Sequence, residues 1–375
     1  MENDVRAKVE LGRTMPKMNV RGAGNYVVNV QILRFFAAFL VVFAHAHVEV
    51  LNVAARSGGT FAGIGLLDWG LGVDIFFVIS GFIMYFMMHD RFGRPGAPLD
   101  FLRRRLVRIV PLYWIFTSLM LVSILAAGSL INNNGLDIRH IIASYAFIPW
   151  PRSDGELFPL LSLGWTLNYE MLFYAVFALA LCMRRTLGIV VMLVIFGVLC
   201  MAAAIAPQDF WLLRFWGNGM IGEFLLGIGL AALYLKGYRL PVRAVVAMIA
   251  AGLVLAVVLY QISAYEHVTR LITGGIPAIL ITAAFVLGPA APSARWSRAL
   301  ALGGDASYAL YLSHPFTLKI FGVVAAKLGL PLIIIFAGGL VASIVVSIGV
   351  HLFLEKPLGS WLSRRTARPA ARQAA

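Results

Sequence analysis

The chain has 375 residues, of which 61% are hydrophobic and only 13% are charged. Soluble domains contain roughly 45–50% apolar and about 25% charged residues, so this composition excludes a soluble globular protein and indicates a polytopic membrane protein. The net charge of +14 would favour nucleic acid as a partner of a soluble chain. In a membrane chain the placement of charges matters more than their sum, so we expect membrane lipids and no nucleic acid as partners.

Ten apolar runs follow one another along the chain, each close to the ~20 residues that a helix needs to cross the hydrocarbon core. The sequence therefore predicts an all-α polytopic membrane protein with about ten transmembrane helices. The runs cover residues 28–50, 69–89, 106–127, 165–183, 187–206, 211–235, 242–260, 271–289, 306–326 and 330–354.

Lysine and arginine gather in alternate connections between these runs, most densely at 91–108, 236–243 and after 356. Cytoplasmic loops of membrane proteins carry an excess of basic residues, so this alternation predicts that both termini are cytoplasmic. The chain then divides into a basic N-terminal segment, a ten-helix domain and a basic cytoplasmic tail that we expect to be disordered, over 1–27, 28–358 and 359–375.

The first run carries three polar residues that are costly inside a bilayer, Arg34, His45 and His47. Arg34 and His45 are eleven positions apart, about three full helical turns, so they lie on one face and are separated by ~16 Å along the axis. His47 points roughly 200° away from that face. We expect His45 in the outer third of the span and Arg34 in its cytoplasmic third.

Two carboxylates come from other predicted helices at a depth similar to that of His45. Asp74 lies near the outer end of the second run and Glu170 near the outer end of the fourth. Ionisable groups inside membrane spans usually serve a function, so we expect these three side chains to meet. Asp74, Glu170 or Glu49, one turn beyond His45, is expected to orient the imidazole.

Four arginines stand at the mouth of the third run, namely Arg103, Arg104, Arg105 and Arg108. They either anchor the topology on anionic lipids or bind a phosphate-rich cytosolic cosubstrate, because guanidinium groups bind phosphates bidentately.

Glu223 in the middle of the sixth run and His314 in the inner half of the ninth are further buried polar candidates. Each either makes a structural hydrogen bond to a neighbouring helix or serves a function. The outer loop at about 128–164 is a solvated linker or an acceptor-binding lid.

Ordered blocks over residues 28–358 carry a resemblance to a known family. They are Arg34 to His45 as an Arg-x10-His motif, "GVDIFFVISGF" at 72–82, "RRLVRIVPLYW" at 104–114, "WTLNYEMLFY" at 165–174, "EFLLGIGLA" at 223–231, "SYALYLSHPF" at 307–316 and "EKP" at 355–357. The chain resembles the acyltransferase-3 family of integral-membrane O-acyltransferases, in particular its exopolysaccharide-acetylating branch. Many members have two consecutive glutamates in the fourth block, whereas here Met171 follows Glu170.

The resemblance implies transfer of an acyl group, usually acetyl from acetyl-CoA, to a hydroxyl of a cell-surface or exported carbohydrate at the bacterial inner membrane. It also implies that His45 is catalytic, acting as a general base near neutral pH. Asp74 or Glu170 would then hold its tautomer, and the donor would bind at Arg34, Arg104, Arg105 and Arg108. Glu223, Tyr308 and His314 are the remaining site candidates, and no metal is expected.

Two other classes of function are compatible with the residues themselves. A proton-coupled transporter could use buried histidine and carboxylate side chains as a relay. A structural or signalling membrane protein is the third class. The arginine cluster has no natural role in a transporter, and no internal repeat of the kind that many transporters show is visible in the sequence.

Overall fold

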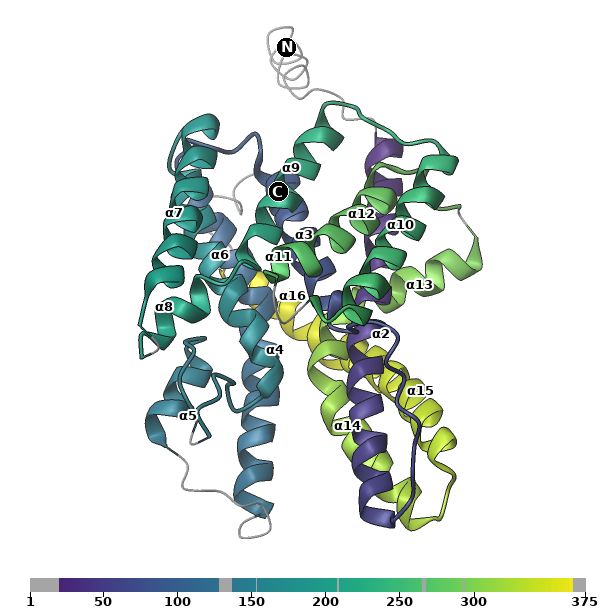
Figure 1. The fold of residues 1–375 in the computed structure, drawn as a ribbon. Coiled ribbons are helices and arrows are strands. Elements are labelled where there is room, and N and C mark those ends of the chain that lie inside the picture. The colour runs from purple at the N-terminus through teal and green to yellow at the C-terminus, as the bar shows by residue number, and fades with distance from the viewer. Residues whose placement is uncertain are drawn as a thin grey trace, which may run out of the picture.

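The computed structural model describes residues 20–127, 137–152, 154–207, 209–264, 268–292 and 294–366. Every regular element within these ranges is a helix, and together the helices form one bundle (Figure 1). Nine helical segments of the described chain are long and apolar enough to cross a membrane. The remaining predicted span, 165–183, is the 17-residue helix α6. The prediction of an all-α polytopic membrane protein is confirmed.

The helices follow the apolar runs closely. Their bounds are α2 Val20–Ser57, α3 Leu71–Met88, α4 Ala97–Ala127, α5 Ile138–Tyr145, the short 3₁₀ turn Ser162–Gly164, α6 Trp165–Leu181, α7 Arg185–Ile205, α8 Trp211–Trp216, α9 Ile221–Leu235, α10 Val242–Gln261, α11 Arg270–Thr273, α12 Gly275–Leu287, α13 Arg295–Asp305, α14 Ser307–Lys327, α15 Leu332–Val350, a π-helical turn His351–Glu355 and α16 Lys356–Thr366.

Three helices extend beyond the predicted runs. Helix α2 continues to Ser57, beyond the predicted end of the first run, and His45 lies about two thirds of the way along it. Helix α4 begins at Ala97, which places the arginine cluster inside the helix. The expected disorder after Pro357 is wrong for residues up to Thr366, because α16 continues the last span. Residues 1–19 and 367–375 of the two predicted terminal segments lie outside the described residues.

Two of the predicted runs are broken helices. The run 211–235 divides into α8 and α9, and the run 271–289 divides into α11 and α12. Glu223 stays near the middle of the span Trp211–Leu235, as expected, but the break after α8 places it in the first turn of α9, where it is fully buried. Interrupted helices place backbone ends and polar side chains at membrane depth, where only a protein interior tolerates them.

Helix α3 forms the centre of the bundle and packs most extensively against α9. Two glycines allow the contact. A Cβ atom at Gly81 would lie 2.0 Å from the carbonyl oxygen of Phe224, and one at Gly227 would lie 2.1 Å from that of Val78. Small residues that let two backbones approach are the usual device of helix pairs in membranes.

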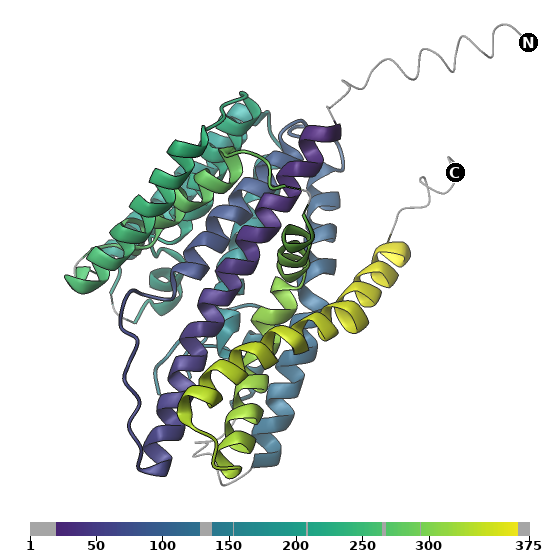
Figure 2. The same cartoon turned by 90° about the vertical axis from the view of Figure 1, so that its right-hand side faces the viewer.

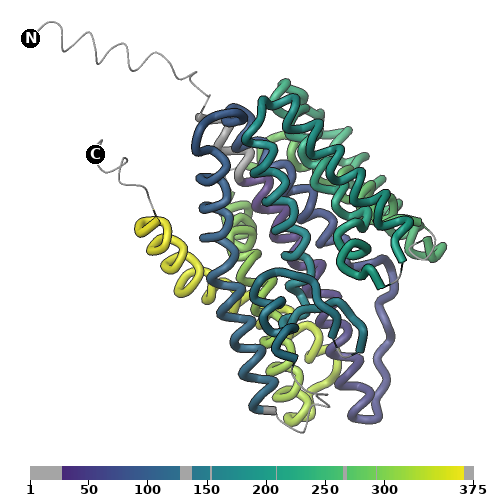
Figure 3. Tube along the Cα trace, turned by 90° about the vertical axis from the view of Figure 1, so that its left-hand side faces the viewer, coloured from purple at the N-terminus to yellow at the C-terminus, as the bar shows by residue number. Residues whose placement is uncertain are grey.

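Helices α2, α14 and α15 form a second packed group, and α16 leaves it obliquely toward the end of the bundle at which α2 begins (Figure 2). The segment between α4 and α6, described from residue 137 apart from residue 153, folds back beside α4 (Figure 3). Tyr113 Oη and Trp114 Nε1 of α4 donate hydrogen bonds to the carbonyl oxygens of Ser144 and Tyr145, each at 3.0 Å. The described part of this segment, from residue 137 onward, is thus anchored structure and not a loose linker.

The predicted orientation is tested by cysteine labelling. In a background with Cys182→Ala and Cys200→Ala, we expect Glu156→Cys to react with a membrane-impermeant maleimide in intact cells and Arg94→Cys to react only after lysis, because the basic loops are predicted to be cytoplasmic. Both positions are exposed, so accessibility within the fold does not bias the comparison. Reaction of Arg94→Cys in intact cells would show that the protein has the opposite orientation in the membrane.

Candidate active site

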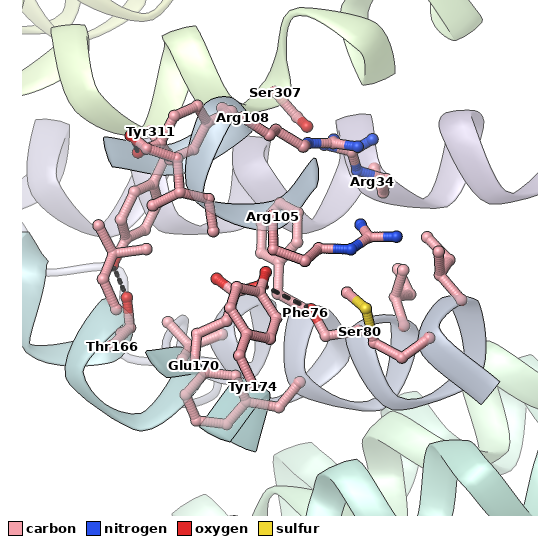
Figure 4. A pocket seen from close by; sticks show the side chains of 18 residues that line it. Arg34, Phe76, Ser80, Arg105, Arg108, Thr166, Glu170, Tyr174, Ser307 and Tyr311 are labelled. Atoms are coloured by element: carbon pink, nitrogen blue, oxygen red, sulfur yellow. Dashed lines mark hydrogen bonds between the residues drawn. The ribbon is translucent and has the colours of Figure 1, made fainter. Parts of the chain in front are cut away.

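A narrow cavity of about 100 Å³ lies between α2, α3, α4, α6 and α14. Three guanidinium groups gather toward one end of it, and Thr166 and Tyr311 lie at the other (Figure 4). The polar residues that line it are Arg34, Ser80, Arg105, Arg108, Thr166, Glu170, Tyr174, Ser307, Tyr308 and Tyr311. The structure thus brings Arg34, Glu170 and most of the arginine cluster together, from helices far apart in the chain.

The cations of this cavity have few partners. Arg34 is 7% exposed, and its Nη1 donates to Gln31 Oε1 at 3.0 Å. Arg105 is equally buried, its Nη2 approaches Met87 Sδ at 3.4 Å, and its Nε has no hydrogen-bond partner. Arg108 has no hydrogen-bond or ion-pair partner within the described part of the chain. Buried charges normally need partners, so this cluster is suited to hold an anion.

Glu170 is the only carboxylate among the described residues that line the narrow cavity. Its Oε1 accepts hydrogen bonds from Ser80 Oγ at 3.2 Å and from Tyr174 Oη at 2.5 Å. Tyr308 donates to the carbonyl oxygen of Ile109 at 2.8 Å and thereby ties α14 to α4. Glu170 therefore has an environment of hydroxyls and guanidinium groups and does not contact His45.

A second, wider cavity of about 430 Å³ adjoins the first, and Arg34 and Arg108 line both. Arg104 lines the wider cavity and forms an ion pair with Asp100 at 2.8 Å. Arg103 lines neither of the two and pairs with Asp100 at 3.2 Å. The arginine cluster is thus divided: three members face cavities, whereas Arg103 also donates to the carbonyl oxygen of Thr366 at the end of α16.

The two histidines His45 and His314 do not line the narrow cavity, but His314 lies close to Tyr311, at the end of the cavity opposite the arginines. Their ring centroids are 5.0 Å apart, and the centroid of Tyr311, which lines the cavity, is 6.3 Å from that of His314. Because a carbonyl oxygen only accepts, His45 Nδ1 donates its proton to Val41 O at 2.8 Å, and His314 Nδ1 donates to Leu310 O at 2.9 Å. In the neutral rings both Nε2 atoms then carry free lone pairs.

His47 has a different environment, as the helical spacing predicts. Its Nε2 accepts a hydrogen bond from the backbone N–H of Ile64 at 3.1 Å, so it holds the connection between α2 and α3. Glu49 is bound to Lys319 at 3.3 Å. The geometry therefore gives Glu49 a structural ion pair and no contact with the imidazole of His45.

The structure does not bring Asp74 to His45, contrary to the expectation that three groups of equal depth would meet. Asp74 is fully buried, and its two oxygens accept from Nε and Nη2 of Arg270 at 2.8 and 3.0 Å. Arg270 also pairs with Asp68 at 3.3 Å, and Glu223 lies against Asp74. Equal depth failed as a criterion because it says nothing about the direction in which each helix turns its side chain.

The sequence interpretation missed Arg270, Tyr174 and Tyr311. Arg270 stands at the edge of an apolar run, where a basic residue is explained by interfacial anchoring. The two tyrosines are ordinary members of apolar helices and give no signal until the cavity is seen. The second histidine, His314, was marked in the sequence by the motif "SYALYLSHPF" at 307–316.

Residues 27–352 match the family model described as an acyltransferase domain. The chain is 35% identical over 291 residues to the exopolysaccharide production protein ExoZ of Rhizobium meliloti (strain 1021). The aligned region covers 76% of this chain and 88% of that relative. The chain is 34% identical over 102 residues to nodulation protein 10 of Rhizobium leguminosarum bv. viciae, over 27% of this chain and 26% of that protein. No solved structure matches the chain significantly.

Proposed function

The chain belongs to the acyltransferase-3 family, and from that premise we propose that it moves an acetyl group from acetyl-CoA to a hydroxyl of an exported or cell-surface carbohydrate at the bacterial inner membrane. That it is a multi-pass membrane acyltransferase follows from the family and the helices. The donor, the acceptor and the residue roles are the proposal. The relation to an exopolysaccharide production protein supports the class of acceptor.

One observation carries the proposal: the His45 imidazole, with a free Nε2, lies against His314, which is close to Tyr311 at one end of a narrow cavity whose other end is cationic. The phosphates of the donor would bind Arg34 and Arg108, and the thin thioester-bearing arm would occupy the narrow cavity. The thioester would then approach the side of Tyr311 and the two histidines. A site of this form separates recognition of the donor from the reaction itself.

His45 would serve as the general base. Its Nε2 takes the proton from the acceptor hydroxyl as the oxygen attacks the thioester carbon. The new C–O ester bond forms, the C–S bond breaks, and the imidazolium returns the proton to the departing sulfur. The hydrogen bond from Nδ1 to Val41 O keeps the base in the required tautomer, a role that the sequence had assigned to a carboxylate.

The direct test uses the full-length protein in lipid nanodiscs and in cells. We expect release of free thiol from acetyl-CoA that depends on added extracellular polysaccharide, and ester-linked acetate on that polysaccharide only in cells that contain the protein. Proton flux without thiol release or acetylated product would support the transporter hypothesis instead.

Donor binding gives a further prediction. Arg108→Ala should raise the KM for acetyl-CoA about 10-fold or more with little change in kcat, because a charge-assisted hydrogen bond of about 1.5–3 kcal/mol to a remote phosphate contributes equally to ground and transition states. Arg94→Ala removes the same charge at an exposed position outside both cavities and is the matched control, with an expected unchanged KM. Equal effects of the two variants on KM would show that the arginine cluster serves membrane anchoring and not donor binding.

A further inference from the structure

The C-terminal helix α16 forms one wall of the wider cavity. Lys356, Gly359, Ser360 and Ser363 line the cavity and recur at the spacing of a single helix face. The helix is reached through the π-helical turn His351–Glu355, and both of those end residues line the cavity as well. Single π turns inside longer helices are frequently found at functional sites.

The wider cavity has more positive than negative charge. Lys356 enters from α16, opposite Arg104 and Arg108 of α4, and Arg34 stands where the two cavities adjoin. The two carboxylates that line it are bound to other lining residues: Asp305 accepts from Gln31 Nε2 at 2.6 Å, and Glu355 binds His351 Nδ1 at 2.7 Å. Lys356 has no hydrogen-bond or ion-pair partner among the described residues.

The remaining wall is apolar and is made by Val107, Pro111, Leu112 and Leu358. A cavity with several cations, two serine hydroxyls and an apolar strip matches the chemistry of a phosphorylated nucleotide, in which a ribose joins anionic phosphates to a flat base. Its volume of about 430 Å³ lies in the roughly 300–1,000 Å³ range of small-molecule sites. The adjoining narrow cavity is too small for such a group and fits a thin chain.

We propose that α16 and α4 together bind the nucleotide end of an acyl-CoA donor, with Lys356 contacting its phosphates and Ser360 and Ser363 its polar edge. This rests on the proposed function and adds a binding element from the segment after the last span. The donor would lie across Arg34 and Arg108, with its nucleotide between α4 and α16 and its acyl-bearing arm in the narrow cavity.

The test separates the nucleotide from the rest of the donor. Binding of adenosine 3′,5′-bisphosphate to the full-length protein is measured by calorimetry, and kcat/KM is compared for acetyl-CoA and acetyl-pantetheine, which lacks the nucleotide. Lys356→Ala and Ser363→Trp should each weaken nucleotide binding about 10-fold or more, by loss of a charged contact and by obstruction. The same variants should lower kcat/KM for acetyl-CoA while leaving that for acetyl-pantetheine within about 2-fold.

Arg365→Ala is the matched control, because it removes a positive charge from the other side of α16, where the guanidinium lies over the Trp361 ring at 4.3 Å. It should change neither measurement.

Equal losses of kcat/KM for the two donors, or unchanged nucleotide binding in both Lys356→Ala and Ser363→Trp, would overturn the inference. Nucleotide binding that disappears when phosphatidylglycerol is added to phosphatidylcholine nanodiscs would instead identify a lipid headgroup site. Nucleotide binding without acyl transfer would refute the proposed function but not this site.

Discussion

Replacing His45 by alanine is expected to abolish acyl transfer and to leave expression and membrane insertion unchanged. The side chain is the imidazole of α2 whose Nε2 is free, and it lies beside His314, which is close to Tyr311 at one end of the narrow cavity. Loss of a general base commonly costs about 10²–10⁴-fold in rate, which is large enough to measure even in crude membranes. The readout is thiol release from acetyl-CoA per amount of folded protein.

His47 provides the control on the same helix. Its Nε2 accepts a hydrogen bond from the backbone N–H of Ile64. Because one hydrogen bond is lost, His47→Ala should lower the free energy of unfolding by about 1 kcal/mol. It should keep most of the activity. Donor binding is the second readout, because His45→Ala should still bind acetyl-CoA with nearly unchanged affinity. Equal losses of turnover at His45 and His47, or an active His45→Ala protein, would show that the wrong residue carries the reaction.

Replacing Arg270 by alanine should destabilise the fold more than any substitution in the cavities. The change would leave Asp74, which is fully buried, beside Glu223 without a cation. Removing one partner of a buried ion pair typically costs about 3–5 kcal/mol, because the other charge stays buried and unpaired. We expect a large drop in the thermal unfolding temperature of the protein in nanodiscs, together with lower yield.

The double variant Asp74→Leu/Arg270→Met separates a structural from a catalytic role of this cluster. Apolar replacement of both partners is often neutral, so the double variant should recover much of the stability that Arg270→Ala loses. Its activity per folded molecule should be close to that of the parent, because neither side chain contacts the cavities or His45. A stable but inactive double variant would restore Asp74 to the catalytic role that the sequence suggested.

Much of this protein could be predicted from the sequence because membrane helices are dictated locally. A run of about 20 apolar residues satisfies its own backbone hydrogen bonds inside a bilayer, so existence and approximate bounds of each span follow from composition. The face shared by Arg34 and His45, and the different direction of His47, follow equally from helical geometry. The ordered motifs over residues 28–358 were sufficient to indicate the family, which the family model then confirmed.

What depends on several helices at once could not be predicted in this way. Asp74 is bound to Arg270, 196 positions away, and the ring of His45 faces that of His314 across two helices. A single helix determines how far along its axis a side chain lies, whereas its rotation and its neighbours are set by packing such as the glycine contacts between α3 and α9. The sequence alone therefore established the helices, their motifs and the faces of α2. Only the tertiary structure decided which carboxylate meets which cation, because that depends on how the packed helices are turned toward one another.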